Sequence, residues 1–177
     1  MHLAEQLSKK PTRNKGDAQV RSNELSIGKL PSNSCLIFSE EDQAYADELK
    51  QHLAALNEDD RITFTEIVVK KTTKVLSNAV MQHLHEADTL LCLLSSTLLA
   101  TSIFRQDFLQ LAAQQQKTID TVILRECAWQ KIGAHLYLYN KGQVLPPDRY
   151  AREAHWLALA ELLVKGIPKH KNNVTHE

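Results

Sequence analysis

The segment from residue 89 to residue 96, Thr-Leu-Leu-Cys-Leu-Leu-Ser-Ser, constrains the fold more than any other part of the sequence. It is apolar without a break from Leu90 to Leu94, and two serines follow it. A run that is so short and so uniformly apolar indicates a strand buried on both faces. Strands of this kind belong to parallel sheets covered by helices, so we expect the flanking segments to be crossover helices.

Periodicity in the rest of the chain supports the same architecture. Apolar residues recur every three or four positions from Tyr45 to Leu56, which predicts an amphipathic helix over residues 41–56. The other expected strands are 35–38, 61–67, 121–124 and 136–139, and the other expected helices are 76–87, 103–115 and 150–165, with an exposed loop at 68–74. The sequence thus predicts an α/β fold, a doubly wound, mostly parallel five-stranded sheet with helices on both faces, as in flavodoxin-like proteins.

Charge and composition divide the chain into three parts. Residues 1–33 are rich in Lys, Asn, Ser, Gly and Pro and carry six Lys or Arg against three Asp or Glu, which predicts a flexible basic tail. We expect one folded domain at 34–166 and a disordered C-terminal tail at 167–177. Residues 34–164 carry 12 basic and 17 acidic side chains. That acidic balance argues against a general nucleic-acid binder.

The three cysteines are far apart in the sequence and show no metal-ligand spacing. Cys35 and Cys92 fall in apolar strand-like runs, so we expect buried thiols in a reducing compartment and no metal site. Cys127 lies near a strand end and is expected to be inert. The first 30 residues lack the apolar core of a signal peptide, and no run approaches 18 apolar residues. We therefore expect a cytoplasmic protein that does not bind membranes.

Ligands of doubly wound sheets bind beyond the carboxyl ends of the strands. In this chain those positions are 39–42, 66–74, 95–107 and 125–129. None of the five glycines lies there, which excludes the glycine-rich phosphate loops of ordinary nucleotide-binding folds. Ser95 and Ser96 follow the central strand at the place where a response-regulator receiver carries its phosphorylated aspartate, so that class is disfavoured as well.

The order of these segments resembles the Toll/interleukin receptor (TIR) domain family, in particular its bacterial branch. The resemblance covers residues 34–165 and depends on several motifs taken together. The similar segments are Ser39-Glu40-Glu41-Asp42, the Ala87-Asp88 pair with the apolar strand behind it, residues 95–104, the Leu124-Arg125-Glu126-Cys127-Ala128-Trp129 segment, and the turn at 139–146.

The resemblance implies a module that associates with other TIR domains. Members of the family associate through the loop after the second strand to relay signals or to build filaments. In this chain the corresponding interface residues are Val68, Val69, Lys70, Lys71 and Lys74. We expect a homo-oligomer and a role in bacterial defence or host interaction, which is the innate-immunity context of the family.

The resemblance also implies an alternative function, hydrolysis of NAD+ at the nicotinamide glycosidic bond. Family enzymes use a glutamate on the third helix, four residues after an aromatic residue. Counting four from Ile103 reaches Asp107, which is the candidate catalytic residue. The substrate contacts would be Ser39, Asp42, Lys70, Lys71 and Ile103, with NAD+ as substrate and no cofactor.

The residues themselves leave simpler interpretations open. Asp107 can be a solvated helix residue, and Ser39 with Asp42 can be a helix cap. The lysines at 70, 71 and 74 can be an ordinary solvated loop. A nucleotide-binding sensor that has lost turnover is a third functional reading.

Overall fold

The computed structural model describes residues 32–56, 62–117 and 119–165, and it contains one five-stranded sheet. The strands are β1 (Ser32–Ser39), β2 (Ile62–Val69), β3 (Thr89–Leu94), β4 (Ile119–Ile123) and β5 (Leu136–Leu138). Their order is β2-β1-β3-β4-β5, and every pairing is parallel. The doubly wound fold is confirmed. The expected tails lie outside the described residues, apart from positions 32 and 33, which belong to β1.

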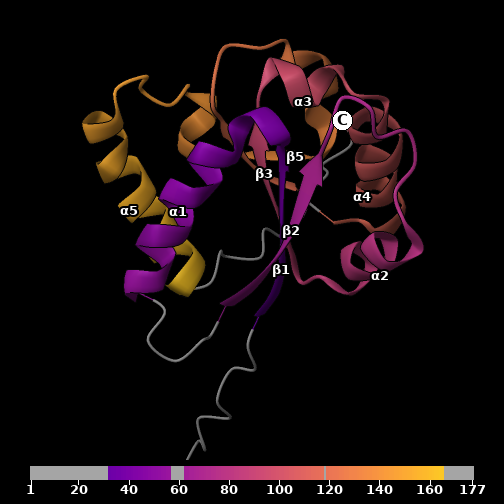
Figure 1. The fold of residues 1–177 in the computed structure, drawn as a ribbon, viewed down its shortest axis with the longest axis horizontal. Coiled ribbons are helices and arrows are strands. Elements are labelled where there is room, and N and C mark those ends of the chain that lie inside the picture. The colour runs from indigo at the N-terminus through magenta and orange to yellow at the C-terminus, as the bar shows by residue number, and fades with distance from the viewer. Residues whose placement is uncertain (1–31, 57–61, 118, 166–177) are drawn as a thin grey trace, which may run out of the picture.

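Helices cover both faces of the sheet. One face carries α1 (Gln43–Leu56) and α5 (Arg149–Lys165), and the other carries α2 (Asn78–Glu86) and α4 (Leu109–Gln115) (Figure 1). A short helix, α3 (Ser96–Ala100), follows β3 and packs Leu98 into the same core as α2. None of the described helices has the length and apolar character needed to cross a membrane.

The central strand β3 contributes side chains to the hydrophobic cores on both faces of the sheet. Cys92 and Leu94 face the core under α2 and α4, whereas Leu91 and Leu93 face the core under α1 and α5. All residues from Leu90 to Leu94 are buried. The prediction of a strand buried on both faces is confirmed, because each face is covered by helices.

The end of β2 corrects one expectation. Val68 and Val69 were expected in an exposed loop, but they are the last two residues of β2 and lie in register with Phe38 and Ser39 of β1. Val69 is buried, and only Val68 is exposed, at 37%. Their β-branched side chains suit a strand, and the length of β1 allows the ladder to continue past Ile67. The exposed loop therefore begins at Lys70.

The third helical region also differs from the prediction of one regular helix over 103–115. Residues 104–108 form a π-helical turn, η2 (Phe104–Phe108), in which the N–H of Leu109 donates to the carbonyl oxygen of Phe104. The side chains of Phe104 and Phe108 are both buried, with ring centroids 6.1 Å apart. A π turn inserts one extra residue into a helix, and such turns recur at functional sites. Asp107 lies within this turn.

A polar clamp ties α5 to α1. The guanidinium of Arg152 donates to both carboxylate oxygens of Glu48, at 3.0 and 2.8 Å, and the indole of Trp156 donates to Glu48 Oε2 at 2.9 Å. Arg152 also donates to the carbonyl oxygens of Pro146 and Pro147. Because Arg152 and Trp156 are buried, the clamp fixes α5 and the loop before it on one face of the sheet.

Candidate functional site

All five strands are parallel, so their carboxyl ends meet at one edge of the sheet, and the strand order reverses direction between β1 and β3. This is the position at which doubly wound folds usually bind ligands. In this protein the side chains of Ser95 and Asp42 meet at this position. Ser95, directly after β3, donates its hydroxyl to Asp42 Oδ2 at 2.5 Å, and both residues have no exposed surface.

Arg125 completes the pairing of the buried carboxylate. It follows β4 and donates from Nη2 to Asp42 Oδ1, while its own side chain is 49% exposed. Both oxygens of Asp42 are therefore engaged by protein groups. A buried charge requires such partners, and the geometry identifies Asp42 as a structural anion at the switch point.

Two lysines after β2 join the same edge. Lys71 Nζ lies 2.5 Å from Glu41 Oε1, Thr97 donates to Glu41 Oε2 at 2.8 Å, and Lys70 Nζ lies 3.2 Å from Glu40 Oε1. The hydrogen bonds from Lys71 and then from Thr97 lower the pKa of Glu41. The switch-point network, as we name it, comprises Glu40, Glu41, Asp42, Lys70, Lys71, Ser95, Thr97 and Arg125. It links the loops that follow β1, β2, β3 and β4.

The predicted dinucleotide contacts are present at this edge but are occupied or covered. Ser39 is buried and accepts a hydrogen bond from the N–H of Glu41, which confirms it as a helix cap. Lys70 and Lys71 are paired with carboxylates. Ile103 has no exposed surface and packs in the core, so it offers no stacking surface in this structure. Of the two remaining candidates for substrate contact or catalysis, Asp42 is buried and Asp107 is partly exposed.

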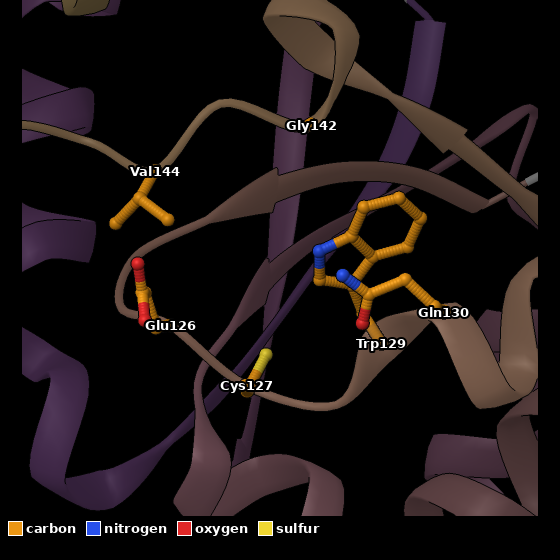
Figure 2. Close-up of a pocket in the computed structure, with 6 residues that line it drawn as sticks. All are labelled: Glu126, Cys127, Trp129, Gln130, Gly142 and Val144. Carbon is orange, nitrogen blue, oxygen red and sulfur yellow. The ribbon is translucent and has the colours of Figure 1, made fainter.

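A cavity of about 550 Å³ lies after β4, and its lining includes Glu126, which follows Arg125 of the switch-point network in the chain. Figure 2 shows the side chains around it, with the Cys127 sulfur and the Trp129 indole on one side and Val144 and Glu126 on the other. Its volume is within the usual range for small-molecule sites. The lining residues are Glu126, Cys127, Trp129, Gln130, Gly142 and Val144.

Sequence reasoning identified only part of this cavity. Residues 125–129 were expected at a strand end, but Gly142 and Val144, which also line the cavity, were not expected there. Val144 reaches the sheet through a bridge to Ile123. The signal that could have located these two residues is the Lys141-Gly142 turn, in which Gly142 has φ +77°. A turn of this kind sends the chain back past the end of β4.

The thiol in the cavity is not activated. Burial raises the pKa of Cys127, so the neutral form predominates at neutral pH. Cys35 and Cys92 are buried, as predicted for core thiols. Within the described part of the chain, no three His, Cys, Asp or Glu side chains are grouped to hold a metal ion.

No protein-family model matches the chain, and no curated protein is similar to it at a significant level.

Proposed function

We propose that this protein is a TIR-like assembly module that acts by self-association through the segment after β2. The observation that carries the proposal is a contrast at the carboxyl edge. The groups that would hold a dinucleotide are buried or paired, as described for Ile103, Asp42, Lys70 and Lys71. The neighbouring segment presents free surface.

That surface combines apolar and basic side chains. Val75 is 79% exposed and Val68 is 37% exposed, and Lys74 between them is exposed as well. Exposed β-branched residues beside lysines suit a protein interface with an apolar centre and a charged rim. The acidic balance of residues 34–164 supplies a complementary partner in a second copy.

Sedimentation velocity over a range of protein concentrations tests the proposal. The double variant Lys74→Glu, Val75→Glu changes this exposed surface and should associate at least about tenfold more weakly than the wild type. Lys165→Glu on α5 is the matched control, because Lys165 is also an exposed lysine. A wild-type chain that remains monomeric at every concentration contradicts the proposal. So does equal weakening by the control.

Hydrolysis of NAD+ is the second candidate function, and two observations favour it. The cavity after β4 is large enough for part of a dinucleotide and includes an indole, Trp129, that can stack on a planar base. Asp107, which is not among the residues that line this cavity, lies in a π-helical turn and is partly exposed. In this reaction water adds to the ribose carbon as nicotinamide leaves, and a carboxylate stabilises the positive charge that develops on the ribose.

Chromatography of nicotinamide released from NAD+ tests the second candidate. Release by the wild type that disappears in Asp107→Asn would establish Asp107 as catalytic. Asp107→Glu restores the longer side chain of the family and should increase release if the carboxylate is too short to reach the ribose. Absence of release from the wild type and from Asp107→Glu, at concentrations that drive assembly, would reject this function.

A further inference from the structure

β2 is an edge strand of the described sheet. Of the described strands only β1 pairs with it, and it has eight residues, which corresponds to about 26 Å at the usual rise per residue. Among the described residues, no strand pairs with its other side. Five of its eight side chains are partly or fully exposed, whereas β3 is buried from Leu90 to the end of the strand.

The sequence of β2 lacks the usual protection of edge strands. Natural edges carry lysines, prolines or unpaired charges that prevent further pairing. The strand reads Ile-Thr-Phe-Thr-Glu-Ile-Val-Val, with no lysine and no proline. Its single charge, Glu66, is neutralised by Lys50 of α1 at 2.7 Å. The edge therefore has the composition of an interior strand that is missing a neighbour.

We propose that the outer edge of β2 pairs antiparallel with β2 of a second copy, so that two sheets join into one continuous ten-stranded sheet. This inference rests on the proposed self-association and specifies its geometry. It also accounts for the exposure of Val68, which the partner strand would cover.

The side-chain pattern of β2 selects one register. A twofold axis normal to the sheet keeps the α1 face of both copies on the same side, so residues that face each other must belong to the same face of the strand. If the axis passes through Glu66, two carboxylates lie opposite each other, which is unfavourable. If it passes through Thr65, threonine faces threonine and Val68 faces the partner's Ile62.

Charge complementarity favours a second copy as the occupant of this edge. Lys50 and Glu66 are each about one-third exposed at the side chain, so their pairing leaves them open to further contact. In the Thr65 register, Glu66 of one copy lies diagonally across from Glu66 of the other, with a Lys50 beside each. The four charges can then form an alternating cluster, which an uncharged or purely acidic strand would not provide.

Disulfide trapping tests this register directly. Thr65→Cys should form a covalent dimer under mild oxidation, because the two side chains meet at the axis at a separation that a disulfide can span. Thr63→Cys is the matched control, since it faces Ile67 in this register. If exposure alone determined the rate of trapping, Thr63→Cys would be trapped faster than Thr65→Cys, because Thr63 is the more exposed residue. Both variants are made with Cys127→Ser, so that the remaining cysteines are buried.

Each outcome has a distinct meaning. Trapping of Thr65→Cys at least about tenfold faster than Thr63→Cys supports the proposal, whereas equal or reversed rates overturn it. A wild-type dimer in sedimentation without trapping of Thr65→Cys overturns the edge pairing and leaves the self-association intact. A monomer with no trapping rejects both.

A charge variant provides a second measurement that does not depend on oxidation. Thr65→Lys places two like charges opposite each other at the axis and should weaken association at least about tenfold. Tyr150→Lys, at a residue of α5 that is 80% exposed, is the control and should associate like the wild type. Association of Thr65→Lys at wild-type strength contradicts the pairing.

Discussion

Ser95 donates its hydroxyl to the carboxylate of Asp42 across 2.5 Å, and this contact joins residues 53 positions apart at the point where the strand order reverses. Ser95 also accepts the N–H of Leu98 at the start of α3. One hydroxyl therefore serves a buried charge and a helix end at the same time.

Removal of this hydroxyl should destabilise the fold. Ser95→Ala leaves the buried carboxylate of Asp42 with Arg125 as its remaining partner, and we expect the free energy of unfolding in urea to fall by about 2 kcal/mol. Ser96→Ala is the control, because Ser96 is adjacent and exposed, and it should change stability by less than about 0.5 kcal/mol. Equal effects of the two variants would show that the contact with Asp42 is unimportant.

Loss of the clamp between α1 and α5 should lower the free energy of unfolding more than Ser95→Ala does. Arg152→Met removes the two hydrogen bonds from the guanidinium to the largely buried carboxylate of Glu48 and leaves only Arg149, at 4.0 Å, as a cation beside it. We expect a loss of about 3 kcal/mol in the free energy of unfolding. Lys165→Met removes a lysine from an exposed pair and should cost less than about 0.5 kcal/mol. A similar small effect of both variants would argue that the clamp does not stabilise the fold.

The same clamp predicts a response to acid. Hydrogen bonding from Arg152 holds the pKa of Glu48 below its ordinary value of 4.5. The native state therefore binds a proton less readily than the unfolded chain, so this contribution to stability is present above about pH 4.5 and is lost as the pH falls through the native pKa. Between pH 7 and pH 3, the stability gap between the wild type and Arg152→Met should narrow in urea titrations, and a constant gap would contradict this account.

Asp120 predicts a pH dependence of opposite sign. Burial on β4 raises its pKa from 3.8 to about 7. The native state holds this proton more tightly than the unfolded chain, so the contribution is fully present below about pH 4 and is lost as the pH rises through 7. Asp120→Asn should therefore gain about 2 kcal/mol relative to the wild type between pH 5 and pH 8, measured by denaturant unfolding. A difference that does not change with pH would reject the burial of this carboxyl as its cause.

A side chain at position 142 should destabilise the fold. Its φ of +77° is unfavourable for other residues, and an added Cβ would lie 3.0 Å from Leu138 Cδ1 and 3.1 Å from Trp129 Cζ2. We expect Gly142→Ala to cost about 1 kcal/mol or more and to shift the tryptophan fluorescence, because the indole must move. Unchanged fluorescence and stability would show that this turn is not constrained by the cavity wall.

The sequence predicted most of the fold because hydrophobic periodicity reports burial directly. The burial of Leu90–Leu94, the short edge strand near residue 137 and the amphipathic α1 all follow from side chains that face a core. The predicted end of β2 was wrong because two valines followed by two lysines resemble the start of a basic loop. Their place in the ladder depends on the length of β1, which local pattern does not report.

The site was less predictable than the fold. The sequence located Ser39 and Asp42 at the correct edge, but the pairing of Asp42 with Ser95 and Arg125 joins residues that are distant in sequence. The π turn at Asp107 also left no periodic signal, because the buried residues Phe104 and Phe108 are four positions apart, as they would be on one face of a regular helix. These features arise from tertiary contacts, and a single sequence contains no direct record of them.

The pairing of Lys70 and Lys71 with Glu40 and Glu41 determines what kind of surface can bind at this edge. Any anion that takes Lys71 removes the cation from Glu41 and leaves that carboxylate with its hydrogen bond from Thr97, so binding here is an exchange of partners. A purely acidic surface would be repelled by the carboxylates that it frees. The surface best suited to this edge is ampholytic, with a cation placed to accept each released glutamate.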